Sequence, residues 1–224
     1  MNTTQRIAAA AAAALLFAAT PAGATNHEPA PPAEQPAEQP AEAQWPPAST
    51  HGKFVPFPEE FQQPMTFPAC DSEVTLTPGD VDEREYRALV DAEGDTVVQF
   101  HGAATVDITR ASDGAMLDEV DASGGGVDIF SADGKSITFD WAGPAVVVAL
   151  DEVEAQEFAE AGLPQAFLYL SGELTETVTF ESEFQPDQEV PPVASSEITD
   201  NSTEYVFNLC NLLDQAAAEE TSAP

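Results

Sequence analysis

The fold is decided by residues 132–150, Ala-Asp-Gly-Lys-Ser-Ile-Thr-Phe-Asp-Trp-Ala-Gly-Pro-Ala-Val-Val-Val-Ala-Leu. The stretch opens with an Asp-Gly step at 133–134, which favours a tight turn between two strands. Ile, Phe and Trp then alternate with polar residues over 137–141, and this spacing puts the apolar side chains on one face of a strand. The unbroken apolar run at 145–150 is typical of a strand buried on both faces. Together these features indicate an all-β protein.

The same pattern extends on both sides of this stretch from Cys70 onward. A second Asp-Gly step stands at 113–114, and a second continuous apolar run covers Ala166 to Leu170. The spacing predicts about eight to ten strands, in an antiparallel β-sandwich or barrel. Further apolar pairs two residues apart are Val74 and Leu76, Val106 and Ile108, and Val178 and Phe180.

Two segments do not follow the strand pattern. Residues 152–161 are rich in Ala, Glu and Gln, and Gly162 and Pro164 would stop a helix there, so we expect one short helical segment across one end of the sheets. Phenylalanine and proline alternate over 53–68, and proline disfavours a helix or a central strand. We expect an extended lead-in whose rings pack onto the domain; the alternative is a docking motif for a proline-reading groove.

The N-terminus has the three parts of a secretory signal peptide. Arg6 precedes an apolar run, Ile7 to Ala19, and the small residues Ala-Gly-Ala at 22–24 precede the expected cleavage before Thr25. The apolar run is shorter than the roughly 17 residues that a membrane span needs. We therefore predict that residues 1–24 are removed and that the protein is secreted, without membrane insertion.

Composition predicts the remaining domain boundaries. Residues 25–52 consist mainly of Pro, Ala, Glu and Gln, which cannot bury enough apolar surface to offset the entropy of ordering. We expect a disordered linker there, acting as a spacer or only as a solubilising tether. The β-rich domain is expected at 53–214, followed by a disordered tail at 215–224.

The chain is strongly acidic, with 40 Asp and Glu against 6 Lys and Arg and a net charge of −34. This charge excludes nucleic acid as a partner, because phosphate backbones are bound by clustered Lys and Arg. It also keeps copies of the chain apart, so we expect a monomer. The acidity is consistent with solubility alone, with a saline habitat, or with weak cation binding at the surface.

Cys70 and Cys210 are the only cysteines, and they stand at the two ends of the domain. In an exported chain, an even count without a CxxC motif favours a disulfide over a metal or redox site. Closing a loop of about 140 residues would remove on the order of 5 kcal/mol of unfolded-state entropy. Two free thiols or an intermolecular bridge remain the alternatives.

The residues of the domain offer little for catalysis. His27 and His51 lie in the linker, so His101 is the one histidine of the domain, and it is expected at the surface or in a turn. No serine elbow, phosphate-binding loop or zinc spacing occurs, so we name no catalytic residue and expect no cofactor. The run Ser123 to Gly126 is interpreted as a flexible inter-strand loop rather than an anion-binding nest.

Two groups of acids could hold calcium, which prefers oxygen ligands. Neither matches the spacing of a helix-loop-helix calcium site, so calcium binding stands only as an alternative. The metal candidates are Asp118, Glu119, Asp121 and Asp128, and the second group is Asp80, Asp82, Glu83 and Glu85.

The order of several short motifs between Phe54 and Leu213 resembles a family of uncharacterised secreted β-rich proteins of actinobacteria. The resemblance implies paired terminal cysteines and no known activity. This chain departs from the family at Gly172-Glu173 and Gly124-Gly125 and is more acidic, which leaves a shared ligand site in doubt. The motifs are Phe67-Pro68-Ala69-Cys70, Asp113-Gly114, Ser123-Gly124-Gly125, Asp133-Gly134, Gly162-Leu163-Pro164, Phe167-Leu168-Tyr169-Leu170-Ser171-Gly172 and Cys210-Asn211-Leu212-Leu213.

These observations favour a non-enzymatic extracellular or envelope-associated binding or structural module, with an unidentified partner such as an envelope component. One alternative is a small secreted hydrolase that uses carboxylates, as glycosidases do. It would require a concave pocket that holds two close acids with raised pKa values. The other alternative is a calcium-dependent surface protein.

Overall fold

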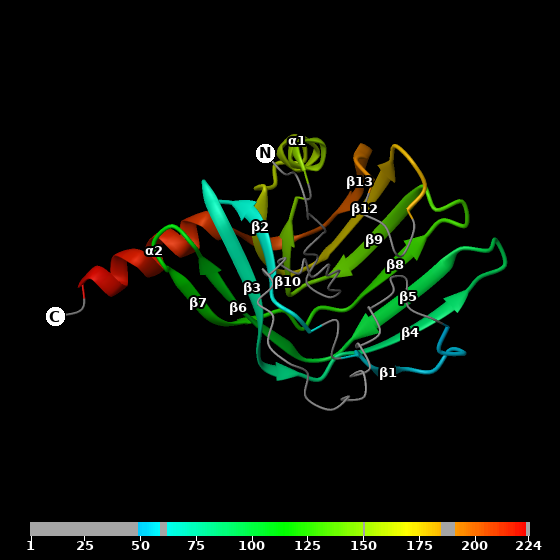
Figure 1. The fold of residues 1–224 in the computed structure, drawn as a ribbon, viewed down its shortest axis with the longest axis horizontal. Coiled ribbons are helices and arrows are strands. Elements are labelled where there is room, and N and C mark those ends of the chain that lie inside the picture. Colours follow the sequence, from blue (N-terminus) through cyan, green and yellow to red (C-terminus); the bar gives the residue numbers. More distant parts are fainter. Residues whose placement is uncertain (1–48, 59–61, 150, 185–190, 223–224) are drawn as a thin grey trace, which may run out of the picture.

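The computed structural model describes residues 49–58, 62–149, 151–184 and 191–222. These residues form three antiparallel sheets and two helices in a layered, sandwich-like arrangement (Figure 1). The all-β prediction is confirmed. Within the described ranges no sheet closes into a barrel, so of the two predicted architectures the sandwich is the better description.

The largest sheet has seven strands in the spatial order β1-β4-β5-β8-β9-β12-β13. Every neighbouring pair in it is antiparallel. The strands are β1 (Val55–Pro56), β4 (Glu85–Val90), β5 (Thr96–His101), β8 (Gly126–Phe130), β9 (Ser136–Ala142), β12 (Glu173–Phe180) and β13 (Val193–Asn201).

Two smaller sheets complete the layers. A three-stranded sheet has the order β10-β11-β14, with β10 (Ala145–Val148), β11 (Ala166–Ser171) and β14 (Glu204–Asn208). A four-stranded sheet has the order β2-β3-β6-β7, with β2 (Met65–Ala69), β3 (Ser72–Asp82), β6 (Ala104–Arg110) and β7 (Met116–Asp121).

Strand β10 lies between two hydrophobic cores, which explains its unbroken apolar sequence. Ala145 and Val147 belong to the first core, made with the inner faces of the seven-stranded sheet and helix α1. Val146 and Val148 belong to the second core, made with the four-stranded sheet and helix α2. Successive side chains of a strand point to opposite faces, so a strand shared by two cores must be apolar at every position. The prediction for this run is confirmed.

The predicted helical segment is helix α1 (Glu152–Glu160). Asp151 caps it, because its side chain accepts hydrogen bonds from the backbone N–H groups of Val153 and Glu154. The helix ends before Gly162, which has a φ of +78°. It packs against β13 at one end of the seven-stranded sheet (Figure 1).

The two Asp-Gly steps lie in hairpin turns, as predicted, but these are not two-residue turns. Only the glycines, Gly114 and Gly134, have positive φ values there, +78° and +67°. The two-residue turn is instead Cys70-Asp71, between β2 and β3, where both φ values are positive although neither residue is glycine. That geometry is typical of a type I′ turn, which sequence reasoning assigns to Asn-Gly or Asp-Gly.

Two predicted boundaries are wrong. Thr50, which was predicted to lie in the linker, forms two hydrogen bonds to Ala88 of β4. Thr50 N donates to the Ala88 carbonyl at 3.0 Å, and Ala88 N donates to the Thr50 hydroxyl at 3.1 Å. At the other end, residues predicted as a frayed tail continue helix α2 (Leu209–Ser222). Alanine and glutamate favour a helix wherever the first turns are anchored, and here Leu209 and Leu213 are fully buried in the second core.

The Phe- and Pro-rich lead-in forms edge strands, as its prolines predict. β1 is at one edge of the seven-stranded sheet and β2 at one edge of the four-stranded sheet. Phe57 is buried in the first core, whereas Phe54 stacks at 4.4 Å between ring centroids on His101. The expected packing of the rings onto the domain is confirmed for these two residues.

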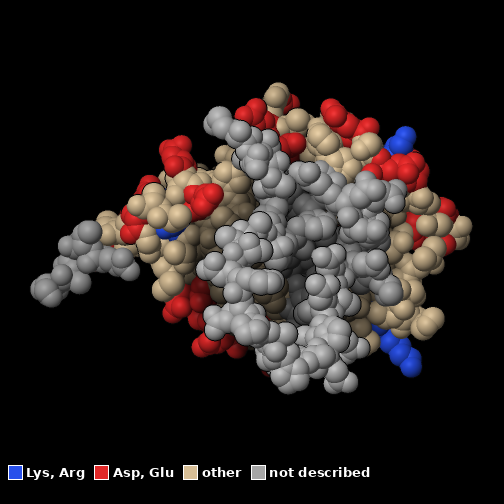
Figure 2. All heavy atoms as spheres, viewed as in Figure 1, with Lys and Arg blue, Asp and Glu red and all other residues tan. Residues whose placement is uncertain are grey.

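The described surface is acidic in many places rather than in one patch. Figure 2 shows Asp and Glu side chains at several places along the margin of one face, with few Lys and Arg among them. Among the described residues, no helix combines the length and the apolar character needed to cross a membrane.

Candidate functional site

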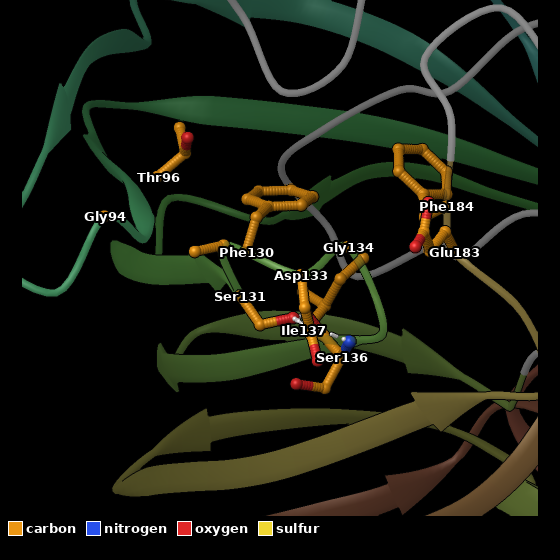
Figure 3. Close-up of a pocket in the computed structure, with 11 residues that line it drawn as sticks. Gly94, Thr96, Phe130, Ser131, Asp133, Gly134, Ser136, Ile137, Glu183 and Phe184 are labelled. Atoms are coloured by element: carbon orange, nitrogen blue, oxygen red, sulfur yellow. Dashed lines mark hydrogen bonds between the residues drawn. The ribbon is translucent and has the colours of Figure 1, made fainter.

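A pocket of about 360 Å³ lies where the β8–β9 turn meets the β4–β5 turn and the chain leaving β12 (Figure 3). Its eleven lining residues come from three separate parts of the sequence, near 94–96, 130–137 and 183–184. Two hydrogen bonds join these parts. Ala132 N donates to Asp95 Oδ1 at 2.8 Å, and Phe184 N donates to the Gly134 carbonyl at 2.6 Å. The pocket is therefore held by the hairpin ends of a continuous sheet.

Aromatic rings form the floor of the pocket. Phe130 and Ile137 are buried where their strands enter the turn, and Phe184 lies beside them. The ring centroids of Phe130 and Phe184 are 6.5 Å apart, and Phe184 is 6.2 Å from the buried ring of Phe180. In Figure 3, the Phe130 ring lies between the turn and the Phe184 ring. Such a floor offers apolar area and the electron-rich faces of rings.

The polar side of the pocket is organised by Asp133. Its Oδ1 accepts hydrogen bonds from Ser131 Oγ at 2.9 Å and from Lys135 N at 3.0 Å. The hydrogen bond from Lys135 N has the largest effect, and together with that from Ser131 it holds the pKa of the Asp133 carboxyl below its usual value. Asp133 therefore stays ionised at neutral and mildly acidic pH. Glu183 supplies a second carboxylate from the β12 side.

Two buried acids lie outside this pocket, on the inner face of the seven-stranded sheet. Asp128 on β8 and Glu176 on β12 are both direct partners of Phe139 on β9, so the three side chains share that face. Burial raises the pKa of Asp128 to about 7, although the indole N–H of Trp141 donates to its Oδ1 at 3.2 Å. Each acid is at most 3 % exposed.

Glu176 is part of a carboxyl group cluster between β12, β13 and α1. The Ser196 hydroxyl donates to its Oε1 at 2.6 Å, and the Glu154 carboxyl of α1 hydrogen-bonds to it. A hydrogen bond between two carboxyl groups needs a proton on one of them. The buried Oε2 of Glu176 has no hydrogen-bond partner among the described residues. Burial accordingly raises the pKa of Glu176, and the charge of Glu157 raises it further.

These acids do not form the site that the hydrolase alternative requires. Two acids with raised pKa values share one face of a sheet, as that alternative asks, but both side chains are enclosed by protein. Neither belongs to the lining of the β8–β9 pocket. Asp128 is bonded to Trp141 and Glu176 to Ser196, as buried polar groups usually are, although Glu176 Oε2 has no partner among the described residues.

The four metal candidates are not brought together. Asp118 and Glu119 join Asp107, with one ligand atom of each within 4.8 Å of the others. Asp121 is exposed at the end of β7, where it accepts a hydrogen bond from Ser123 N, and Asp128 is buried in another sheet. An irregularity in the β6–β7 pairing brings Asp118 and Glu119 together opposite Asp107, whereas Asp121 lies at the end of β7 and Asp128 on β8.

The Glu119 carboxylate within this group is already bonded to the protein. Its Oε1 accepts from Asp80 N at 2.7 Å, and its Oε2 accepts from the Thr105 hydroxyl. The remaining members repel each other, since the charge of Asp107 raises the pKa of Asp118. The second predicted group also disperses: Asp82 forms an ion pair with Arg84 at 2.9 Å.

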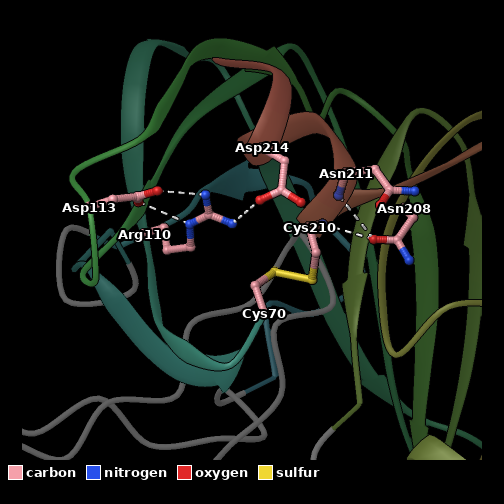
Figure 4. Close-up of a disulfide and its surroundings, with 7 residues drawn as sticks. All are labelled: Cys70, Arg110, Asp113, Asn208, Cys210, Asn211 and Asp214. Atoms are coloured by element: carbon pink, nitrogen blue, oxygen red, sulfur yellow. Dashed lines mark hydrogen bonds and ion pairs between the residues drawn. A yellow bond between two sulfur atoms is a disulfide. The ribbon is translucent and has the colours of Figure 1, made fainter. Parts of the chain in front are cut away.

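The predicted disulfide is present, with Cys70 in the β2–β3 turn joined to Cys210 in the first turn of α2 (Figure 4). Next to it, Arg110 is held between Asp113 at 2.7 Å and Asp214 at 2.6 Å. Asn208 caps α2, because its Oδ1 accepts from Cys210 N at 2.9 Å. We name this arrangement of Cys70, Cys210, Arg110, Asp113 and Asp214 the α2 clasp.

The glycine run lies in the loop between β7 and β8, as predicted, and backbone hydrogen bonds hold it in place. Gly124 N donates to the Pro144 carbonyl at 2.8 Å, and Gly125 accepts from Ala142 N at 2.9 Å. A Cβ at Gly124 would lie 2.1 Å from the Ala142 carbonyl, so glycine is required for close backbone contact there. His101 is exposed at the end of β5, as predicted.

Comparison with known proteins finds no matching family model, no similar curated sequence and no similar solved structure. The resemblance to actinobacterial secreted proteins therefore stays a prediction.

Proposed function

We propose that this protein is exported and acts outside the cytoplasm as a non-enzymatic binding module, with the β8–β9 pocket as its ligand site. The observation that carries the proposal is a pocket of about 360 Å³ with an aromatic floor and fixed polar groups. Small-molecule sites are concavities of roughly 300 Å³ upward that combine apolar walls with a few placed polar groups. This pocket has that size and both kinds of group, although its lining is more polar than apolar.

The lining of the pocket supports binding rather than catalysis. Its potential nucleophiles are the hydroxyls of Thr96, Ser131 and Ser136, and the lining contains no His, Lys or Cys that could act as their base. The Ser131 hydroxyl donates to Asp133, and its oxygen accepts from Ser136 N at 2.9 Å, so it serves the turn.

The leader, the acidic surface and the disulfide support export. Residues 1–24 have the layout of a cleavable signal, and the Cys70–Cys210 bond is stable in an oxidising compartment. The Pro- and Ala-rich chain that follows the leader would act as a tether for the domain. We propose a monomer that binds neither nucleic acid nor an anionic membrane, because its charge repels both.

Binding is tested with a pair of matched glycine variants. In Gly134→Ala, the added Cβ would lie 3.2 Å from the Phe184 carbonyl in the pocket wall, whereas in Gly114→Ala it would meet nothing within 4 Å. Both glycines follow an aspartate in a hairpin turn and have positive φ, so both substitutions carry similar backbone strain. A fragment collection screened by ligand-observed NMR should yield binders that Gly134→Ala weakens and Gly114→Ala does not. The proposal is wrong if no fragment binds, or if both variants bind every fragment equally.

Export is tested by expressing the full chain with its own leader in a bacterial host. We expect the protein in the medium or periplasm, with a new N-terminus at Thr25 and an oxidised Cys70–Cys210 bond by mass spectrometry. Full-length protein retained in the cytoplasm, with Arg6 still present, would contradict this part of the proposal.

A further inference from the structure

We propose that the β8–β9 pocket selects small organic cations, such as substituted amines or quaternary ammonium groups, over neutral and anionic molecules of the same shape. This inference rests on the proposed binding function and specifies the ligand class of the same site. It follows from the two kinds of group that meet there, ring faces and carboxylates.

The charge of the lining has one sign. Asp133 and Glu183 contribute carboxylates, and none of the eleven lining residues is Lys or Arg. Lys135, in the same turn, is exposed and stands outside the lining, although its charge helps to lower the pKa of Asp133. An anion would meet these two carboxylates and the field of a chain with net charge −34, so it would be repelled.

The rings explain why the ligand is an organic cation rather than a metal ion. Calcium needs six to eight oxygen ligands, whereas one wall of this pocket consists of Phe130, Phe184 and Ile137. Aromatic faces attract a cation by their quadrupole and also cover its alkyl groups. A ligand with a positive centre and an apolar body can use the rings and the carboxylates at the same time.

The geometry is prepared before binding. The hydrogen bonds from Ser131 Oγ and Lys135 N are both accepted by Asp133 Oδ1, and they fix this carboxylate in the turn. Two further hydrogen bonds hold the β8–β9 turn: Ala132 N donates to Asp95 Oδ1, and Phe184 N donates to the Gly134 carbonyl. Little conformational entropy would be lost when a compact ligand enters.

Three isosteric probes separate charge from shape: choline, 3,3-dimethylbutanol and 3,3-dimethylbutyrate carry one positive, no and one negative charge. Their affinities are measured by NMR titration of the purified mature protein at physiological salt. We expect choline to bind at least about tenfold more tightly than the alcohol, in line with a desolvated cation–π contact plus ionic attraction, and the carboxylate not to bind.

Asp133→Asn and Asp121→Asn form a matched pair of variants. Both aspartates are exposed and accept a hydrogen bond at 3.0 Å from the N–H two residues later, but only Asp133 lines the pocket. Asp133→Asn should lower the affinity for choline about five- to tenfold, because it removes one nearby charge. Asp121→Asn should leave this affinity unchanged. Phe184→Leu, which keeps the wall apolar, should remove most of the preference for choline over the alcohol. Melting temperatures of all three variants show whether the fold is retained.

The outcomes distinguish this inference from the proposed function. Equal binding of choline and the alcohol, or equal weakening by Asp133→Asn and Asp121→Asn, would overturn cation selection while leaving a working pocket. Absence of choline binding together with fragments that still respond to Gly134→Ala would do the same. Absence of every binder would overturn both proposals.

Discussion

The molecule stabilises its buried charged groups differently at its two helices. At the α2 clasp, the guanidinium of Arg110 lies between the carboxylates of Asp113 and Asp214, beside a disulfide. At α1, the carboxyl groups of Glu154 and Glu176 share a hydrogen bond that depends on a proton. A pair of opposite charges keeps its attraction over a wide pH range, whereas a shared proton is lost as the pH rises. The two helices should therefore respond differently to the same change of conditions.

Loss of the disulfide should have the largest effect on the free energy of unfolding, because it removes the covalent bond of the α2 clasp. Replacing both Cys70 and Cys210 by Ala removes the cross-link across 140 residues and should lower the free energy of unfolding by about 2 to 5 kcal/mol. This loss is measured by comparing the denaturant unfolding of the double variant with that of the oxidised and the reduced natural protein. Equal midpoints for all three would show that α2 does not depend on the bond.

Removal of the guanidinium should have the next largest effect. Arg110→Met keeps an apolar stem but removes charge-assisted hydrogen bonds to Asp113 and Asp214, at a cost of about 2 to 3 kcal/mol. The loss should be nearly constant between pH 6 and 9, because Asp113 has a lowered pKa and Arg110 a raised one. A loss that varied with pH over this range would remove the contrast with α1. The measurement is urea unfolding at several pH values.

The shared proton predicts pH-dependent stability at α1. The folded-state pKa of Glu176 is raised above its usual 4.5, so its contribution is fully present below pH 4.5 and is lost as the pH rises. Glu176→Gln, which keeps a neutral group, should therefore gain about 1 to 2 kcal/mol relative to the natural chain between pH 5 and 8, since one pKa unit corresponds to about 1.4 kcal/mol.

The control for this pH dependence is Glu197→Gln, which removes an exposed carboxylate from the adjacent strand β13. It changes the net charge by the same amount and should leave the slope of stability against pH almost unchanged. Thermal unfolding from pH 5 to 8 compares the two variants. Parallel curves for both would show that total charge, and not the buried pair, sets the slope.

The helix cap should give the smallest effect. Asp151→Ala removes the acceptor for the N–H groups of Val153 and Glu154 and should cost about 1 kcal/mol. Hydrogen exchange should then accelerate in α1 but not in α2, because α2 has its own cap at Asn208 and its own cross-link. Equal acceleration in both helices would mean that they open together.

Much of the architecture could be predicted because its signals are local. Alternation over 137–141 marks β9, the apolar run marks β10, and the composition of 152–161 marks α1. The disulfide followed from an even cysteine count and the expected compartment. The helical end of the chain was missed, because a weakly amphipathic helix depends on anchoring that the sequence does not display.

The sequence by itself determined the β character of the domain, the first helix, the charge and the pair of cysteines, because each depends on neighbouring residues or on composition. It predicted about eight to ten strands, whereas the described residues form fourteen. Only the tertiary structure decided which acids are buried and which meet rings. Asp128 and Asp133 lie five positions apart, yet one is enclosed beside Trp141 and the other lines the pocket near Phe184. Strand pairing brings together residues some thirty to forty positions apart, and the environment of a carboxylate depends on those distant partners.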